Sequence, residues 1–89
     1  MDRSKVFGVL AFEVNELAAM PFEDLAQLCG TTSRQQLEID AHQVEFEYRI
    51  RWTDEQHRLL EINGRAHGAN WWQTERLETR LMVNAPMDS

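Results

Sequence analysis

Residues 44–52 alternate strictly between large apolar and charged side chains, and no other feature constrains the fold of this chain as much. Successive side chains of a β-strand point to opposite faces, so the run predicts a strand with one apolar and one charged face. The segment 57–67 alternates in a compatible way, with Leu60, Ile62 and Ala66 on one parity. We therefore predict a long antiparallel hairpin that spans 43–67.

The pairing of Thr53 with His57 is the register that we predict for this hairpin, and it leaves residues 54–56 as the loop. It places apolar residues opposite one another, whereas a slip of one residue would turn every side chain to the wrong face. It also creates two opposite-charge pairs of the stabilising kind, Arg49 with Glu61 and Glu45 with Arg65.

Gly64 falls inside the returning strand in this register, opposite Phe46. The dipeptide Asn63-Gly64 by itself favours a two-residue turn, which is the alternative. Gly64, Ala66 and Gly68 would leave room on the apolar face. Either the large aromatic side chains fill this room, because protein interiors pack densely, or a small-molecule pocket lies between helix and sheet.

Composition limits the class of protein. The chain has 89 residues and a net charge of −6, with the acidity concentrated in residues 1–42. We expect one domain, 1–89. The acidic balance argues against non-specific binding to nucleic acid or to anionic membranes. The sequence contains neither a membrane-length apolar run nor a signal peptide, so we expect a cytoplasmic protein.

Residues 5–14 are apolar at nearly every position, and their β-branched and aromatic content predicts a buried strand. A helix over the same residues remains the alternative. For residues 15–29 we expect a helix whose ordered core begins at Pro21, with Glu23 and Asp24 against its dipole. It would pack on one face of the sheet.

Two further strands complete the predicted sheet. Residues 35–41 alternate on odd positions, and the change of phase at His42-Gln43 needs a bulge or a turn. We predict one strand over 35–53 with a bulge. Residues 71–83 are predicted as a strand, because a helix would stack like charges, although a helix is the rival. Residues 84–89 are expected to form a frayed tail.

Catalytic and metal-binding signatures are missing from the sequence. Cys29 is the single cysteine, and we interpret it as a small core residue rather than a nucleophile. His57 and His67 would lie at opposite ends of the hairpin, too far apart to share a metal ion. No nucleotide-binding or hydrolase motif occurs. We expect no catalytic, cofactor or metal site.

One segment resembles a known motif. LAQLCGTTSRQQLEI is similar to the turn and second helix of bacterial helix-turn-helix repressors, with Ala26, Gly30 and Ser33 in the positions of the motif's alanine, glycine and serine. The resemblance implies a transcriptional regulator that uses residues 25–39. One extra residue precedes Ser33, and Glu38 and Asp40 would oppose DNA phosphates.

The adjacent pair Trp71-Trp72 suggests an interface. Neighbours on a strand point to opposite faces, so one indole would lie outside the core. Trp and Arg are enriched in interfaces. Trp72, Leu59, Arg65 and Trp71 form the interface that we hypothesise.

These features together predict an α+β protein: an antiparallel sheet of about four strands, centred on the hairpin 43–67, with one helix on one face. The function that we expect is a small acidic non-catalytic protein–protein interaction module, such as an inhibitor, adaptor or chaperone. Its expected partner is itself, as a homodimer. A helix-turn-helix regulator is the alternative, and an enzyme or small-molecule-binding domain is the third possibility.

Overall fold

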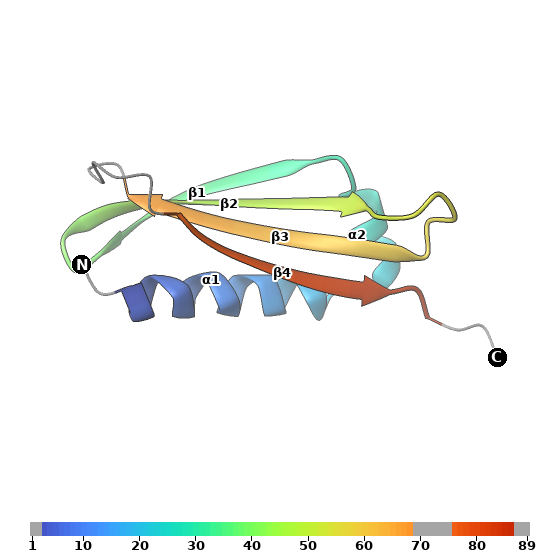
Figure 1. Ribbon diagram of the computed structural model, residues 1–89, viewed down its shortest axis with the longest axis horizontal. Coiled ribbons are helices and arrows are strands. Elements are labelled where there is room, and N and C mark those ends of the chain that lie inside the picture. Colours follow the sequence, from blue (N-terminus) through green and yellow to red (C-terminus); the bar gives the residue numbers. More distant parts are fainter. Residues whose placement is uncertain (1–2, 69–75, 87–89) are drawn as a thin grey trace.

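A computed structural model describes residues 3–68 and 76–86 of the chain. Its centre is a four-stranded antiparallel sheet in the order β1-β2-β3-β4, with each strand beside the next one along the chain (Figure 1). The elements are α1 (Arg3–Ala18), α2 (Phe22–Gln27), β1 (Thr32–Ile39), β2 (His42–Trp52), β3 (Leu59–Gly68) and β4 (Leu77–Asn84). The α+β class and the antiparallel four-stranded sheet are therefore confirmed.

The hairpin of β2 and β3 forms as predicted, with every side chain on the expected face, but its register was wrong by two residues. Tyr48, not Phe46, lies opposite Gly64. The loop is longer than expected, because Thr53 N donates to Leu59 O. Within the loop, the carboxylate of Asp54 accepts hydrogen bonds from the backbone N–H groups of Arg58 and Leu59. This loop structure sets the observed register.

A tight turn, not the expected bulge, joins β1 to β2. Asp40 and Ala41 have φ angles of 51° and 65°, as in the two-residue turns that match the twist of a hairpin. The predicted strand over 35–53 is thus two strands, and β1 occupies the edge beside β2. Because residues 32–39 are a strand, the second helix of the helix-turn-helix resemblance is absent.

Residues 5–14 belong to α1, so the predicted strand is wrong and the helical alternative is correct. The buried residues of α1 are Val6, Leu10 and Val14, which recur every fourth position and so lie along one side of the helix. In a run that is apolar at nearly every position, the alternation of apolar and polar residues cannot distinguish a strand from a helix. Because β1 supplies the fourth strand of the sheet, residues 5–14 are not part of the sheet and cover it as a helix.

The segment predicted as a helix over 15–29 is divided between two helices. Pro21 cannot continue α1, since it lacks the N–H that an interior helical position needs. It immediately precedes α2, which carries Glu23 and Asp24 in its first turn as expected. The helix that covers β3 and β4 is α1, which lies below the sheet in Figure 1.

Strand β4 confirms the predicted strand for residues 77–83, while 71–75 lie outside the described residues. Leu77, Leu81 and Val83 share the helix-facing side, as expected. The tail was predicted to begin at Asn84, but Asn84 is in the strand, and Ala85 N donates to Arg58 O at 2.7 Å.

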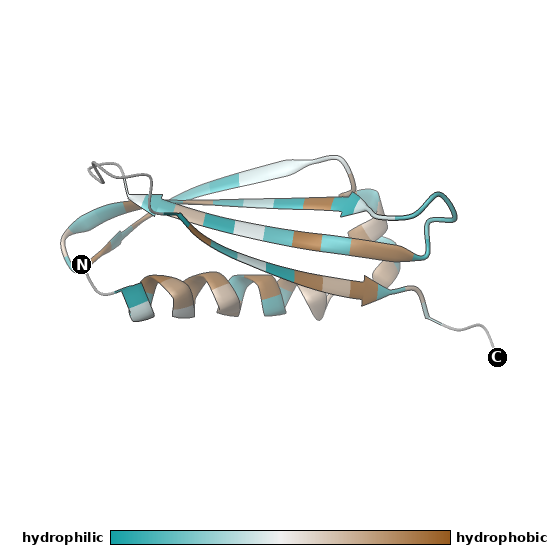
Figure 2. Ribbon diagram, viewed as in Figure 1, coloured by the Kyte–Doolittle hydropathy of each residue, from teal (hydrophilic) through white to brown (hydrophobic). Residues whose placement is uncertain are grey.

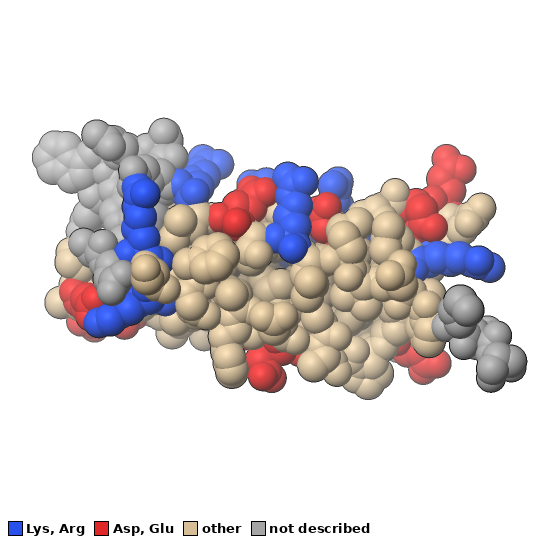
Figure 3. All heavy atoms as spheres, turned by 60° about the horizontal axis from the view of Figure 1, so that its bottom comes forward, with Lys and Arg blue, Asp and Glu red and all other residues tan. Residues whose placement is uncertain are grey.

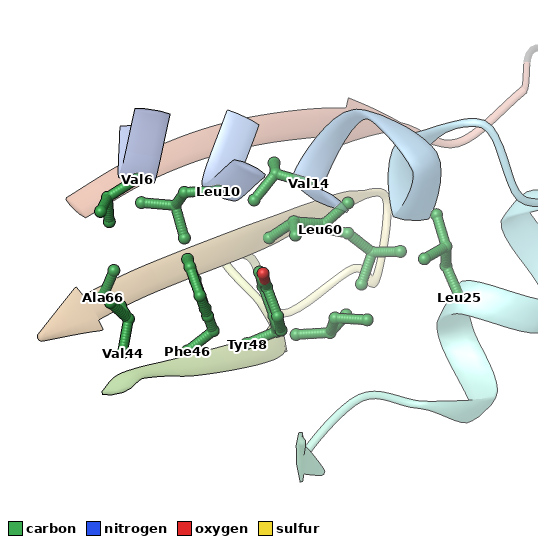
Figure 4. Packing of buried hydrophobic residues seen from close by; sticks show 11 residues of the cluster. Val6, Leu10, Val14, Leu25, Val44, Phe46, Tyr48, Leu60 and Ala66 are labelled. Atoms are coloured by element: carbon green, nitrogen blue, oxygen red, sulfur yellow. The ribbon is translucent and has the colours of Figure 1, made fainter. Parts of the chain in front are cut away.

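The core lies between α1 and the helix-facing side of the sheet (Figure 4). Hydropathy alternates along the strands, whereas α1 is apolar along most of its length (Figure 2). Leu10 of α1, Phe46 of β2 and Leu60 of β3 are completely buried. The room that Gly64 leaves is taken by Leu10 and Val14 of α1 together with Tyr48, so helix side chains, rather than the aromatic rings alone, fill it.

Candidate functional site

The face of the sheet opposite α1, which we call the open face, carries a network of ion pairs. The strand register brings Arg34, Arg51, Arg65 and His67 beside glutamates of neighbouring strands, while Arg49 and Arg80 contact glutamates of their own strands. The ion pairs are Arg51–Glu61 (3.1 Å), Arg34–Glu47 (3.4 Å), Arg49–Glu47 (3.5 Å), Arg65–Glu78 (3.2 Å) and Arg80–Glu78 (3.1 Å), and His67 Nε2 lies 3.7 Å from Glu45 Oε2. The charges that the described residues contribute to this face largely neutralise one another, and these residues supply no excess of the positive charge that nucleic acid requires.

Glu78 is the carboxylate that β4 contributes to this network. Desolvation raises the pKa of Glu78, but hydrogen bonds from Arg80 and Asn63 and the charges of Arg80 and Arg65 outweigh it. The pKa of Glu78 therefore lies below its ordinary value, and the carboxylate stays charged between its two arginines at neutral pH.

The interface hypothesised from the sequence falls partly on the open face. Trp71 and Trp72 lie outside the described residues. Leu59 is half-buried on the open face, one residue before a buried core position. Arg65 is ion-paired with Glu78. This interface stays a prediction.

Cys29 and the possible metal ligands are the other titratable groups that bear on chemistry. Burial raises the pKa of the Cys29 thiol, which keeps it protonated, whereas a nucleophile needs the thiolate. No group of three potential metal ligands occurs in the ranges 3–68 and 76–86. A shallow, open depression lined by Arg34, Gln35, Gln36 and Glu45 lies over β1 and β2, and it does not enclose a ligand.

No helix in the described part of the chain could span a membrane.

The outer surface of α1 is different, because it exposes large apolar side chains. Phe12 is 61% exposed and Phe7 is 44% exposed; among the described residues, the other exposed large apolar side chain is Met82, on the open face. A helix that is apolar on all sides is normally buried on all sides. In this chain, only the side carrying Val6, Leu10 and Val14 is buried.

Few charges interrupt this surface. Figure 3 shows a broad area without charged side chains in the view toward the lower side of the molecule in Figure 1, where α1 lies, with charged side chains mostly toward its margins. Large apolar side chains exposed in such an area, as Phe7 and Phe12 are, are a usual feature of interaction sites in small proteins. We call the side of α1 turned away from the sheet the outer face of α1: Gly8 and Phe12 lie near its middle, Phe7 and Ala11 toward one flank, and Lys5, Val9 and Glu16 toward the other.

Gly8 lies in the middle of this outer face. A Cβ atom built at Gly8 would have no neighbour within 4 Å in the ranges 3–68 and 76–86, so nothing in the described part of the chain requires a glycine there. A glycine inside a helix costs roughly 0.5–1 kcal/mol relative to alanine. Gly8 therefore creates an unfilled notch on the outer face without serving the packing of its own chain.

The sequence contained a signal for this site that the strand interpretation missed. Lys5, Val9, Phe12 and Glu16 are spaced by four, three and four residues, which is the spacing of one stripe along a helix. The comparisons with known proteins add no further guide: no protein-family model, curated protein or solved structure matches the chain.

Proposed function

We propose that the chain is a small acidic non-catalytic module that acts through protein–protein contact, and that the outer face of α1 is its contact surface. The observation that carries this proposal is the exposure of Phe12 and Phe7, at 61% and 44%, on a helix whose opposite side is in the core. An inhibitor, an adaptor and a chaperone all act through such a surface.

The properties of the other surfaces support this choice. The charges of the open face are already paired with one another. Exposed ion pairs of this kind contribute little free energy. The lone half-buried thiol of Cys29 suits a reducing compartment, so we place the module in the cytoplasm.

Co-purification with three tagged forms of the full chain tests the proposal: wild type, Phe12→Asp and Met82→Asp. Untagged wild-type chain and a cell extract are added to each. Both substitutions put a carboxylate on an exposed apolar residue, but Phe12 lies on the outer face of α1 and Met82, 46% exposed, lies on the open face.

We expect wild type and Met82→Asp to retain a protein, either a second copy or another polypeptide, and Phe12→Asp to lose it. Retention of the same proteins by all three forms would contradict the proposal. Loss with Met82→Asp alone would move the contact surface to the open face, where the interface hypothesised from the sequence lies.

A further inference from the structure

We infer that the partner of the outer face of α1 is a second copy of this chain, with the two α1 helices packed antiparallel about a two-fold axis. This inference rests on the proposed function, since it names the occupant of the proposed contact surface. It is carried by the order of side chains along one exposed stripe of α1: Lys5, Val9, Phe12 and Glu16.

The stripe has the geometry of a helix–helix seam. Spacings of four, three and four residues keep side chains on one side of a helix that packs along a second helix. Val9 is half-buried, Phe12 is 61% exposed, and Lys5 and Glu16 are exposed at its two ends. The apolar centre and charged ends match the usual order of an interface, with an apolar core and a polar rim.

The charges of the stripe are self-complementary in one direction only. When a second stripe runs antiparallel, Lys5 of each copy lies beside Glu16 of the other, and Val9 lies beside Phe12. In a parallel pair, Lys5 would meet Lys5 and Glu16 would meet Glu16. Like charges at an interface suppress the wrong arrangement, so the antiparallel arrangement is favoured.

The placement of charge on α1 is unfavourable with respect to the dipole of the helix itself. The first turn has no acidic residue and the last turn has no basic residue, although a helix dipole favours acids at the start and bases at the end. Lys5 lies near the start and Glu16 near the end. An antiparallel neighbour places Glu16 of each copy beside Lys5 of the other, whose ammonium also contacts Asp40 of its own chain, and aligns the two dipoles favourably.

Gly8 completes the seam. In knobs-into-holes packing, a side chain inserts between four residues of the facing helix, and Lys5, Gly8, Val9 and Phe12 form such a hole at the centre of the stripe. The notch at Gly8, where a Cβ would meet nothing of its own chain, makes room for the ring of Phe12 from the second copy.

One intramolecular contact holds the basic end of the stripe in place. Lys5 Nζ lies 2.9 Å from Asp40 Oδ1 and 3.2 Å from Asp40 Oδ2, in the turn between β1 and β2.

The contact along the helix is short: from Lys5 to Glu16 the seam is only about 16 Å long, at 1.5 Å per residue. It belongs to the small class of interfaces, so we expect dissociation in the micromolar range.

Sedimentation of the purified full chain over low to high micromolar concentrations tests this inference with two variants. Gly8→Leu should raise the thermal midpoint, because leucine favours helix and its Cβ atom meets no neighbour among the described residues. It should weaken the dimer about tenfold, because it fills the hole. Gln27→Leu, on the exposed side of α2, is the matched control and should leave the dimer unchanged.

Glu16→Gln reports the direction of packing. In the antiparallel pair it removes an attraction to Lys5 and should weaken the dimer about two- to threefold, whereas in a parallel pair it would relieve repulsion and strengthen the dimer. Glu23→Gln on α2, with the same change of charge, should have no effect.

A wild-type chain that stays monomeric at high micromolar concentration would overturn the inference. So would a dimer that tightens with Glu16→Gln or ignores Gly8→Leu. If the chain is monomeric but wild type retains another protein that Phe12→Asp does not retain, the proposed function stands. Only the inference that the partner is a second copy is then wrong.

Discussion

Gly64 of β3 faces Val14 of α1 so closely that a Cβ atom built at Gly64 would be 2.8 Å from Val14 Cγ2. The same atom would lie 3.0 Å from Leu10 Cδ1 and 3.3 Å from Tyr48 Cδ1. The helix can approach the sheet this closely only because β3 has no side chain at this position.

Gly64→Ala should therefore destabilise the protein by about 1–3 kcal/mol, the usual cost of overpacking a core. Gly8→Ala is the matched control, because its new methyl group meets nothing and improves helix propensity by roughly 0.5–1 kcal/mol. Urea unfolding should show opposite signs for the two variants. Equal effects would mean that α1 does not pack over Gly64.

Tyr48→Phe should leave the protein as stable as wild type or stabilise it by about 1 kcal/mol, since a buried polar group without a partner is costly. The Tyr48 hydroxyl is buried and has no hydrogen-bond partner among the described residues. Burial, and secondarily the charge of Glu13, raises the pKa of Tyr48 to about 12. Chemical denaturation at pH 7 checks this expectation, and a marked loss of stability would show that the hydroxyl is bonded.

Ala41→Gly should stabilise the protein by about 1 kcal/mol, because alanine pays a steric cost in the left-handed region that glycine avoids. The φ angle of Ala41 is 65°. The thermal midpoint measures the effect, and Ala11→Gly, inside α1, should shift it in the opposite direction. A fall in the midpoint for Ala41→Gly would contradict the turn and restore the bulge predicted from the sequence.

Glu78 should make stability depend on pH in the acidic range. Its pKa in the folded protein lies below its ordinary value of 4.5, so the charged form favours folding. This contribution is fully present above the unfolded pKa and is lost as the pH falls through the folded pKa. Urea midpoints of wild type and Glu78→Gln should therefore converge as the pH falls below about 4.5. Parallel profiles would exclude a role for Glu78.

The faces of the hairpin could be predicted from the sequence, but its register could not. Glu45 and Glu47 are both acidic, and Arg49 and Arg51 are both basic. A shift of two residues therefore keeps each side chain on its face and keeps opposite charges paired. Glu61, predicted to lie opposite Arg49, lies opposite Arg51 in the structure. The loop breaks this degeneracy, through Asp54 and its hydrogen bonds to the backbone.

The contact surface on α1 was missed because its helix was missed. A segment that is apolar at nearly every position fits a buried strand as well as a helix, and the β-branched and aromatic content of residues 5–14 favours the strand. The tertiary structure decides between strand and helix. Because β1 is the fourth strand of the sheet, residues 5–14 form a helix, and Val6, Leu10 and Val14 pack against the sheet. Phe12 is then left outside.

The most direct test of the contact surface is a dilution series followed by ¹H–¹⁵N NMR of the full-length chain. We predict concentration-dependent shifts that cluster at Val9, Phe12 and Glu16 on α1 and are absent from Leu59 and Arg65 on the open face. Shifts confined to Leu59 and Arg65 would contradict the account.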